Sequence, residues 1–164
     1  MEGLAAELGQ KDWSAAFQKI GMSLMSTMGG ASGSLYGTLF IAMSKAMKEK
    51  EMNLQNLAEA FGLGVEAVKQ RGKADVGEKT MLDVLIPVAN ALRESAAKPQ
   101  DLPVLLDNIK RVAEAGCEST RDMVPTKGRA SFLGERARGH LDAGARTSQL
   151  MIGAICSVLG GNAS

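Results

Sequence analysis

The sequence predicts an all-α protein, and three observations lead to this fold class. Ala, Leu and Met, which favour helices, supply 51 residues, whereas Val, Ile and Thr, which favour strands, supply 21. Apolar residues recur every three or four positions along six stretches of the chain. Glycines, prolines or short polar segments separate these stretches, so that consecutive helices would reverse direction. We therefore expect an antiparallel up-and-down helical bundle or barrel with about six helices.

Length, composition and charge limit the classes to which the chain can belong. Its 164 residues fit a single domain, 1–164, and an apolar fraction of 45% is enough for a core. The net charge of +1 argues against a protein that coats nucleic acid. The longest apolar stretch, 150–159, is too short to cross a bilayer, so we expect no membrane partner. Cys117 and Cys156 lack the spacing of metal ligands and fit a reducing cytoplasm with both thiols packed.

The first two predicted helices, 12–27 and 34–50, flank a glycine-rich connection. Each has apolar residues at spacings of three or four, which places them on one face of a helix. These stripes are Trp13, Phe17, Ile20 and Leu24 in the first helix and Leu35, Leu39, Met43 and Met47 in the second.

The third and fourth predicted helices, 54–73 and 79–96, are joined by a turn at 75–78. Gly62 and Gly64 would each weaken the third helix by roughly 1 kcal/mol relative to Ala where exposed. Pro87 would kink the fourth helix. The inward residues are Leu57, Phe61, Val65 and Val68, followed by Leu82, Leu85, Ile86, Ala89 and Leu92.

The fifth and sixth predicted helices span 102–120, with Pro103 in the first turn, and 145–159. Between them, 123–144 lacks a helical period, and connections of this length are commonly lids or binding loops. The region 121–146 carries six basic and three acidic residues, a net charge of +3 that the near-neutral total conceals. We expect this connection to attract an anion.

Two glycine-bearing turns are candidate phosphate sites. At 29–33 a backbone could approach a ligand closely, with the next helix start supplying free N–H groups and Ser32 a hydroxyl. The alternative is a tight helix–helix turn in which Ser32 is the N-cap. At 72–80, Lys79 and Thr80 could contact phosphate or adenine, or only begin a helix.

Arg129 and His140 are candidates in the long connection. Arg129 follows Gly128 and could bind phosphate oxygens with two parallel hydrogen bonds, or remain a solvated arginine. His140 is the only histidine, so it cannot form a metal site alone, and we expect it to be a structural hydrogen-bonding residue.

Taken together, these motifs resemble the nucleotide-binding subunit or domain of dihydroxyacetone kinase. The resemblance covers essentially the whole chain in order. It implies an eight-helix antiparallel barrel, of which about six helices are present here, that binds ADP or ATP at one end. It also implies partners: a subunit that holds dihydroxyacetone and, in some members, a phosphocarrier that rephosphorylates bound ADP. The matching segments are 28–33 (MGGASG), 35–37 (LYG), 71–74 (RGKA), 77–84 (GEKTMLDV) and 127–136 (KGRASFLGER).

The resemblance also implies roles for individual residues. Arg129 would have the catalytic role, in which it stabilises charge on the phosphates. Two positions depart from the family pattern, since Glu78 stands where Asp is usual and Ala143 where Pro is usual. The remaining implied nucleotide contacts are Ala31 and Ser32 on the phosphates, Gly72 and Met81 in the pocket, and Asp142, Ala143 and Gly144 as a closing segment.

The family's magnesium-binding aspartates have no counterpart before Gly29. We expect residues 1–10 to correspond to the end of an earlier family helix, the chain to lack the metal loop, and its kinase activity to be impaired. A second hypothesis is a non-catalytic helical module that regulates a partner protein. A third is that missing helices leave an apolar groove that favours self-association, for example as a homodimer.

Overall fold

A computed structural model describes residues 12–98, 100–125 and 129–160. Within these ranges the chain is all-helical, with six α-helices, two 3-10 helices and no strand, which confirms the predicted fold class. The helices group into two compact units, Met1–Gly72 and Lys73–Ser164. In chain order they are α2 (Trp13–Thr27), α3 (Gly30–Ala46), α4 (Leu54–Gly72), α5 (Leu82–Ala97), α6 (Leu102–Ser119), η1 (Thr120–Asp122), η2 (Arg129–Ala137) and α7 (Ala143–Leu159).

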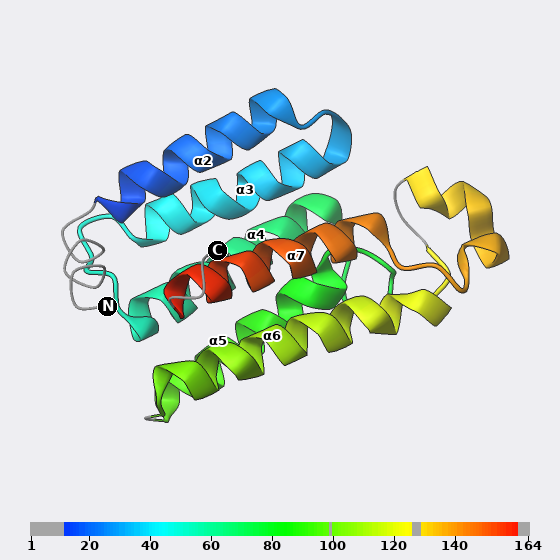
Figure 1. Cartoon of the computed structure of the whole chain (residues 1–164). Helices are drawn as coiled ribbons and strands as arrows, with labels where there is room; N and C mark the ends of the chain where they lie inside the picture. The colour runs from blue at the N-terminus through cyan, green and yellow to red at the C-terminus, as the bar shows by residue number, and fades with distance from the viewer. Residues whose placement is uncertain (1–11, 99, 126–128, 161–164) are drawn as a thin grey trace. The chain divides into compact units, whose positions relative to one another are not determined.

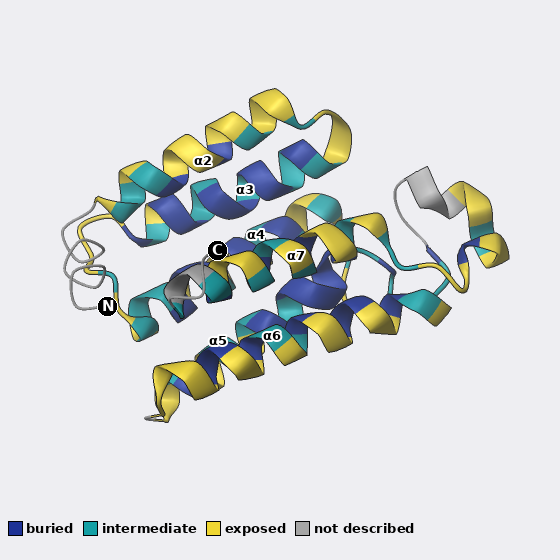
Figure 2. Cartoon of the chain, viewed as in Figure 1, coloured by how far each residue is buried: buried dark blue, intermediate teal, exposed yellow. Residues whose placement is uncertain are grey.

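Helix α3 is the centre of the first unit and packs against both α2 and α4 (Figure 1). The contact with α2 is close, because a Cβ atom at Gly21 or Gly37 would lie 3.1 Å from the carbonyl oxygen of the other residue. The contact with α4 is also close, since a Cβ at Gly64 would lie 2.9 Å from the carbonyl oxygen of Leu39. Figure 2 accordingly shows α3 largely buried and much of α2 exposed.

The start of α2 is predicted correctly, but its buried face is only partly so. Asp12 caps the helix by accepting a hydrogen bond from the Ala15 N–H at 3.1 Å. Phe17 is buried, whereas Ile20 is 41% exposed. The close approach at Gly21 turns the contact face of α2 towards Phe17 and Gly21 and away from Ile20.

In the second unit, α6 packs against both α5 and α7. A Cβ at Gly116 would lie 2.3 Å from the carbonyl oxygen of Asp83, so α6 meets the first turn of α5 backbone to backbone. Cys117 and Cys156 are buried free thiols, as predicted, and desolvation raises the pKa of each. None of the described helices combines the length and apolar character that a membrane crossing requires.

Three helix starts, one helix end and one connection differ from the predictions. The end is that of α3, at Ala46 rather than 50. Helix α3 begins at Gly30 rather than 34, α5 at Leu82 rather than 79, and α7 at Ala143 rather than 145. The connection 123–144, expected to lack helical structure, contains η2. The three helix starts and this connection lie at or beside the candidate site residues.

Candidate functional site

In the first unit, the N-terminus of α3 presents hydrogen-bond donors without a neighbouring acid. Gly29 is the N-cap residue, no side chain caps the helix, and its first turn contains no acidic residue. Ala31 is exposed and Ser32 half-buried within that turn. The first N–H groups of a helix have no intrahelical acceptor and carry the positive end of its dipole. This end of α3 can therefore accept an anion.

Two glycines bring the chain into this helix start. Gly30 has φ +68°, a left-handed conformation that favours glycine. A Cβ at Gly33 would lie only 2.0 Å from the carbonyl oxygen of Met28, so no side chain fits there. Since Gly29 is the N-cap residue, the helix starts before Ser32, and the alternative in which Ser32 is the N-cap is wrong.

The C-terminus of α4 meets the first two turns of α3. The Arg71 Nε donates a hydrogen bond to Ser34 Oγ at 2.8 Å. A Cβ at Gly72 would lie 3.5 Å from the Leu35 side chain. The structure thus places Gly72, a predicted nucleotide contact, beside α3. It also places the Arg71 guanidinium there. No role for Arg71 was predicted from the sequence, although this arginine precedes Gly72 in a matching segment.

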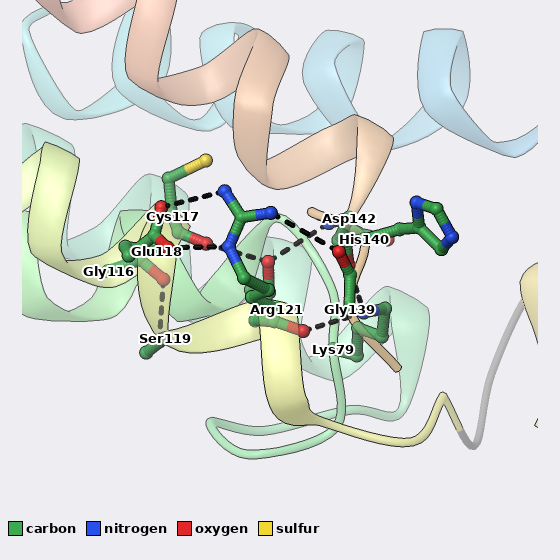
Figure 3. A network of polar contacts seen from close by, with 10 residues as sticks. Lys79, Gly116, Cys117, Glu118, Ser119, Arg121, Gly139, His140 and Asp142 are labelled. Carbon is green, nitrogen blue, oxygen red and sulfur yellow. Dashed lines mark hydrogen bonds and ion pairs between the residues drawn. The ribbon is translucent and has the colours of Figure 1, made fainter. Parts of the chain in front are cut away.

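In the second unit, Lys79 is an internal cross-link (Figure 3). Its side chain is 3% exposed, and its Nζ donates to the carbonyl oxygens of Thr120 at 2.6 Å, Ala137 at 3.1 Å and His140 at 2.5 Å. Lys79 has φ +60° and precedes α5, so it does not begin a helix. The alternative in which Lys79 contacts phosphate or adenine is wrong, because all three of its donors serve the backbone.

Asp83 fixes the turn that carries Lys79. Its buried carboxylate accepts hydrogen bonds from the N–H groups of Gly77 at 2.6 Å and Thr80 at 2.9 Å. Together, Asp83 and Lys79 hold the turn on both sides of Met81.

The N-terminus of α7 brings three predicted residues together. Asp142 caps this helix, because its Oδ2 accepts a hydrogen bond from the Ala145 N–H at 2.9 Å. A Cβ at Gly144 would lie 3.5 Å from the Cβ of Met81, which is itself 5% exposed. Ala143 is the exposed first residue of the helix. Ala143 and Gly144 thus belong to the first turn of α7 and not to the connection without helical period that the sequence predicts.

Burial makes the position of Asp142 unfavourable for a negative charge. Desolvation raises the pKa of its carboxyl group, and the charge of Asp83 acts in the same direction. The hydrogen bond from Ala145 and the charge of Lys79 oppose this rise without cancelling it.

Arg129 and His140 are the remaining candidates in the connection between α6 and α7. Arg129 is the first residue of η2, but its side chain lies outside the part that the structure describes. Phe132 in the same helix is 86% exposed. The His140 ring is exposed and points away from the hydrogen-bonded network in Figure 3. Its structural role is carried by its backbone carbonyl, not by the imidazole.

The described residues do not fit a magnesium site. They contain no group of three or more His, Cys, Asp or Glu side chains that could hold a metal ion. Asp83 and Asp142 already accept backbone N–H groups. The region expected to match the end of an earlier family helix, 1–10, lies outside the described residues.

A shallow groove of about 550 Å³ lies on the second unit and contains none of the predicted site residues. It has charges of both signs, so it favours neither an anion nor a cation. Its lining is Arg111, Glu114, Ala115, Cys117, Glu118, Leu141, Arg146 and Gln149.

Comparison with known proteins decides the family. The model of the DAK2 domain matches residues 1–157. The chain belongs to the DAK2 domain family. This DAK2 domain is 43% identical over 144 residues to the ADP-binding subunit DhaL of PEP-dependent dihydroxyacetone kinase 1 from Listeria innocua. It is 41% identical over 146 residues to the corresponding Escherichia coli subunit.

The fold of this DAK2 domain also resembles a solved kinase. It aligns with the dihydroxyacetone kinase from C. freundii, crystallised with AMP-PNP and Mg²⁺, at a TM-score of 0.62 and 28% identity. The alignment covers 90% of this chain and 23% of the kinase. The matches to the Listeria and E. coli subunits each cover 88% of this chain and 67% and 70% of those subunits.

Proposed function

We propose that this DAK2 domain binds ADP or ATP and serves as the nucleotide-binding component of a dihydroxyacetone kinase. The observation that carries the proposal is the N-terminus of α3, which offers free N–H groups and contains no acidic residue in its first turn. The relatives named as ADP-binding subunits give the anion its chemical identity, a nucleotide diphosphate. These names favour a kinase component over a non-catalytic regulatory module.

Each cluster has a role in this proposal. The N–H groups of Ala31 and Ser32 bind phosphate oxygens, with Arg71 as an added cation. Gly72 and Met81 contact the nucleotide, and Asp142, Ala143 and Gly144 contact it through the start of α7. Arg129 stabilises the phosphate charge during transfer, in the way that guanidinium groups act in phosphoryl transfer.

The partners follow from the same family membership. A dihydroxyacetone-binding subunit would accept the phosphoryl group, and either ATP or a phosphocarrier subunit would supply it. Magnesium would neutralise phosphate charge when bound, but the described residues supply no ligand set for it. The buried free thiols of Cys117 and Cys156 fit a reducing compartment such as the cytoplasm. We also propose that the chain forms a homodimer.

Replacement of Ala31 tests the phosphate site without weakening the helix. A glutamate in the first turn of α3 stabilises the helix through its dipole but repels a phosphate. We expect Ala31→Glu to weaken ADP binding by roughly tenfold or more and to leave the melting temperature unchanged or raised. Ala31→Gln, of the same size but uncharged, is the matched control and should weaken binding less.

Isothermal titration of ADP into the wild-type chain and both variants measures these effects. Equal ADP affinity in the wild type and Ala31→Glu would mean that the N-terminus of α3 does not bind the phosphates. No ADP binding by the wild type would overturn the proposed function itself.

A further inference from the structure

The ammonium group of Lys79 is the point where three backbone segments of the second unit meet. Its three hydrogen bonds use the full donor capacity of a lysine side chain. The three acceptor carbonyls belong to Thr120 in η1, Ala137 at the end of η2 and His140 in the connection to α7. One side chain therefore ties both 3-10 helices and this connection to the turn before α5.

Thr120 extends this link to the start of α7. Its fully buried hydroxyl accepts a hydrogen bond from the Asp142 N–H at 2.9 Å and donates one to the Cys117 carbonyl at 2.7 Å. Asp142 then caps α7 through the Ala145 N–H. Hydrogen bonds therefore connect Lys79 to Thr120, Thr120 to Asp142, and Asp142 to the first turn of α7.

A second tie holds the same connection from the surface. The Gly139 N–H donates to the Arg121 carbonyl at 2.7 Å, and Arg121 Nη1 donates to the Gly139 carbonyl at 3.2 Å. This pair is exposed, so water can replace it at little cost. Two of the three Lys79 hydrogen bonds are buried and the third is partly buried, so water replaces them less readily.

We infer that Lys79 is a positioning residue for nucleotide binding, because it fixes Asp142 and Gly144 at the start of α7 against Met81. The ammonium does not contact phosphate itself. Turning it outward would break all three hydrogen bonds. The carbonyls of Thr120 and Ala137 would then keep only the N–H groups of Met123 and His140 as donors. The effect on nucleotide affinity rests on the proposed function, whereas the effect on the connection does not.

Amide hydrogen exchange without nucleotide tests the link directly. Lys79→Met keeps an unbranched apolar stem of nearly the same length and removes the donors. We expect exchange in 137–146 to become roughly tenfold faster or more, while the centres of α5 and α6 keep their protection. Lys98→Met removes an exposed lysine from the same unit and is the matched control, with no change expected.

A second pair of variants keeps the test valid if Lys79→Met does not fold. Thr120→Val removes the hydroxyl that receives the Asp142 N–H, whereas Thr120→Ser retains it. We expect Val to accelerate exchange in 137–146 and Ser to restore protection.

Titration with ADP then completes the experiment. Lys79→Met or Thr120→Val should weaken ADP binding by roughly tenfold or more, with Thr120→Ser and Lys98→Met close to wild type. Unchanged exchange in 137–146 would overturn the inference whether or not the wild type binds ADP. Faster exchange with unchanged ADP affinity would also overturn it, since the link would then serve stability alone.

Discussion

At the scale of one residue, Asp142 combines a helix-capping hydrogen bond with a site that disfavours its negative charge. Its carboxylate caps α7, yet burial raises its pKa above the ordinary aspartate value. The native state therefore holds the proton more tightly than the unfolded state. By linkage, the contribution of Asp142 to the free energy of unfolding falls as the pH rises from about 3.9 through the folded-state pKa.

Asp142→Asn tests this sign. The amide oxygen can still accept the Ala145 N–H, but the side chain no longer titrates. We expect the difference in unfolding free energy, variant minus wild type, to move in favour of the variant as the pH rises from about 4, and then to level off. Urea denaturation at a series of pH values measures it; a difference that moves the other way would mean that the carboxylate is stabilised by its surroundings.

The burial of three polar residues could not be predicted from the sequence. Lys79, Asp83 and Thr120 stand in a polar segment or at a helix end, where such residues are usually solvated. Asp83 accepts N–H groups of Gly77 and Thr80 from the turn just before it. The burial of Lys79 and Thr120, in contrast, depends on carbonyl and N–H groups from distant parts of the second unit. No local pattern encodes those partners, so the residues that organise this cluster could not be found from the sequence.

At the scale of elements, two of the three glycines in α4 have opposite effects on its packing. A Cβ at Gly62 would meet nothing within 4 Å, whereas one at Gly64 would lie 2.9 Å from the Leu39 carbonyl oxygen. We expect Gly62→Ala to stabilise the chain by about 0.5–1 kcal/mol through helix propensity. Gly64→Ala should destabilise it by about 1–3 kcal/mol, because α3 and α4 must separate.

Chemical denaturation of the two alanine variants measures the contrast, and each variant is the control for the other. Equal effects of the two substitutions would mean that the close contact between α3 and α4 does not contribute to stability.

Elements were predicted well where local signals define them. Regular apolar spacing and caps placed α2, α4 and α6 within about one residue of their observed bounds. The starts of α3, α5 and α7 were misplaced because a left-handed Gly30, a buried Lys79 and the Asp142 cap set them. Two of these starts, those of α3 and α7, carry predicted nucleotide contacts.

At the scale of the whole molecule, the central claim is that the diphosphate of ADP binds at the N-terminus of α3. Backbone amide chemical shifts in a titration with ADP test it most directly, with adenosine, which lacks the diphosphate, as the control. We predict that ADP produces its largest shifts in 29–34 and 142–146, and that adenosine leaves 29–34 unchanged. ADP shifts confined to the groove around Arg111 and Gln149, or equal shifts of 29–34 with adenosine, would contradict the account.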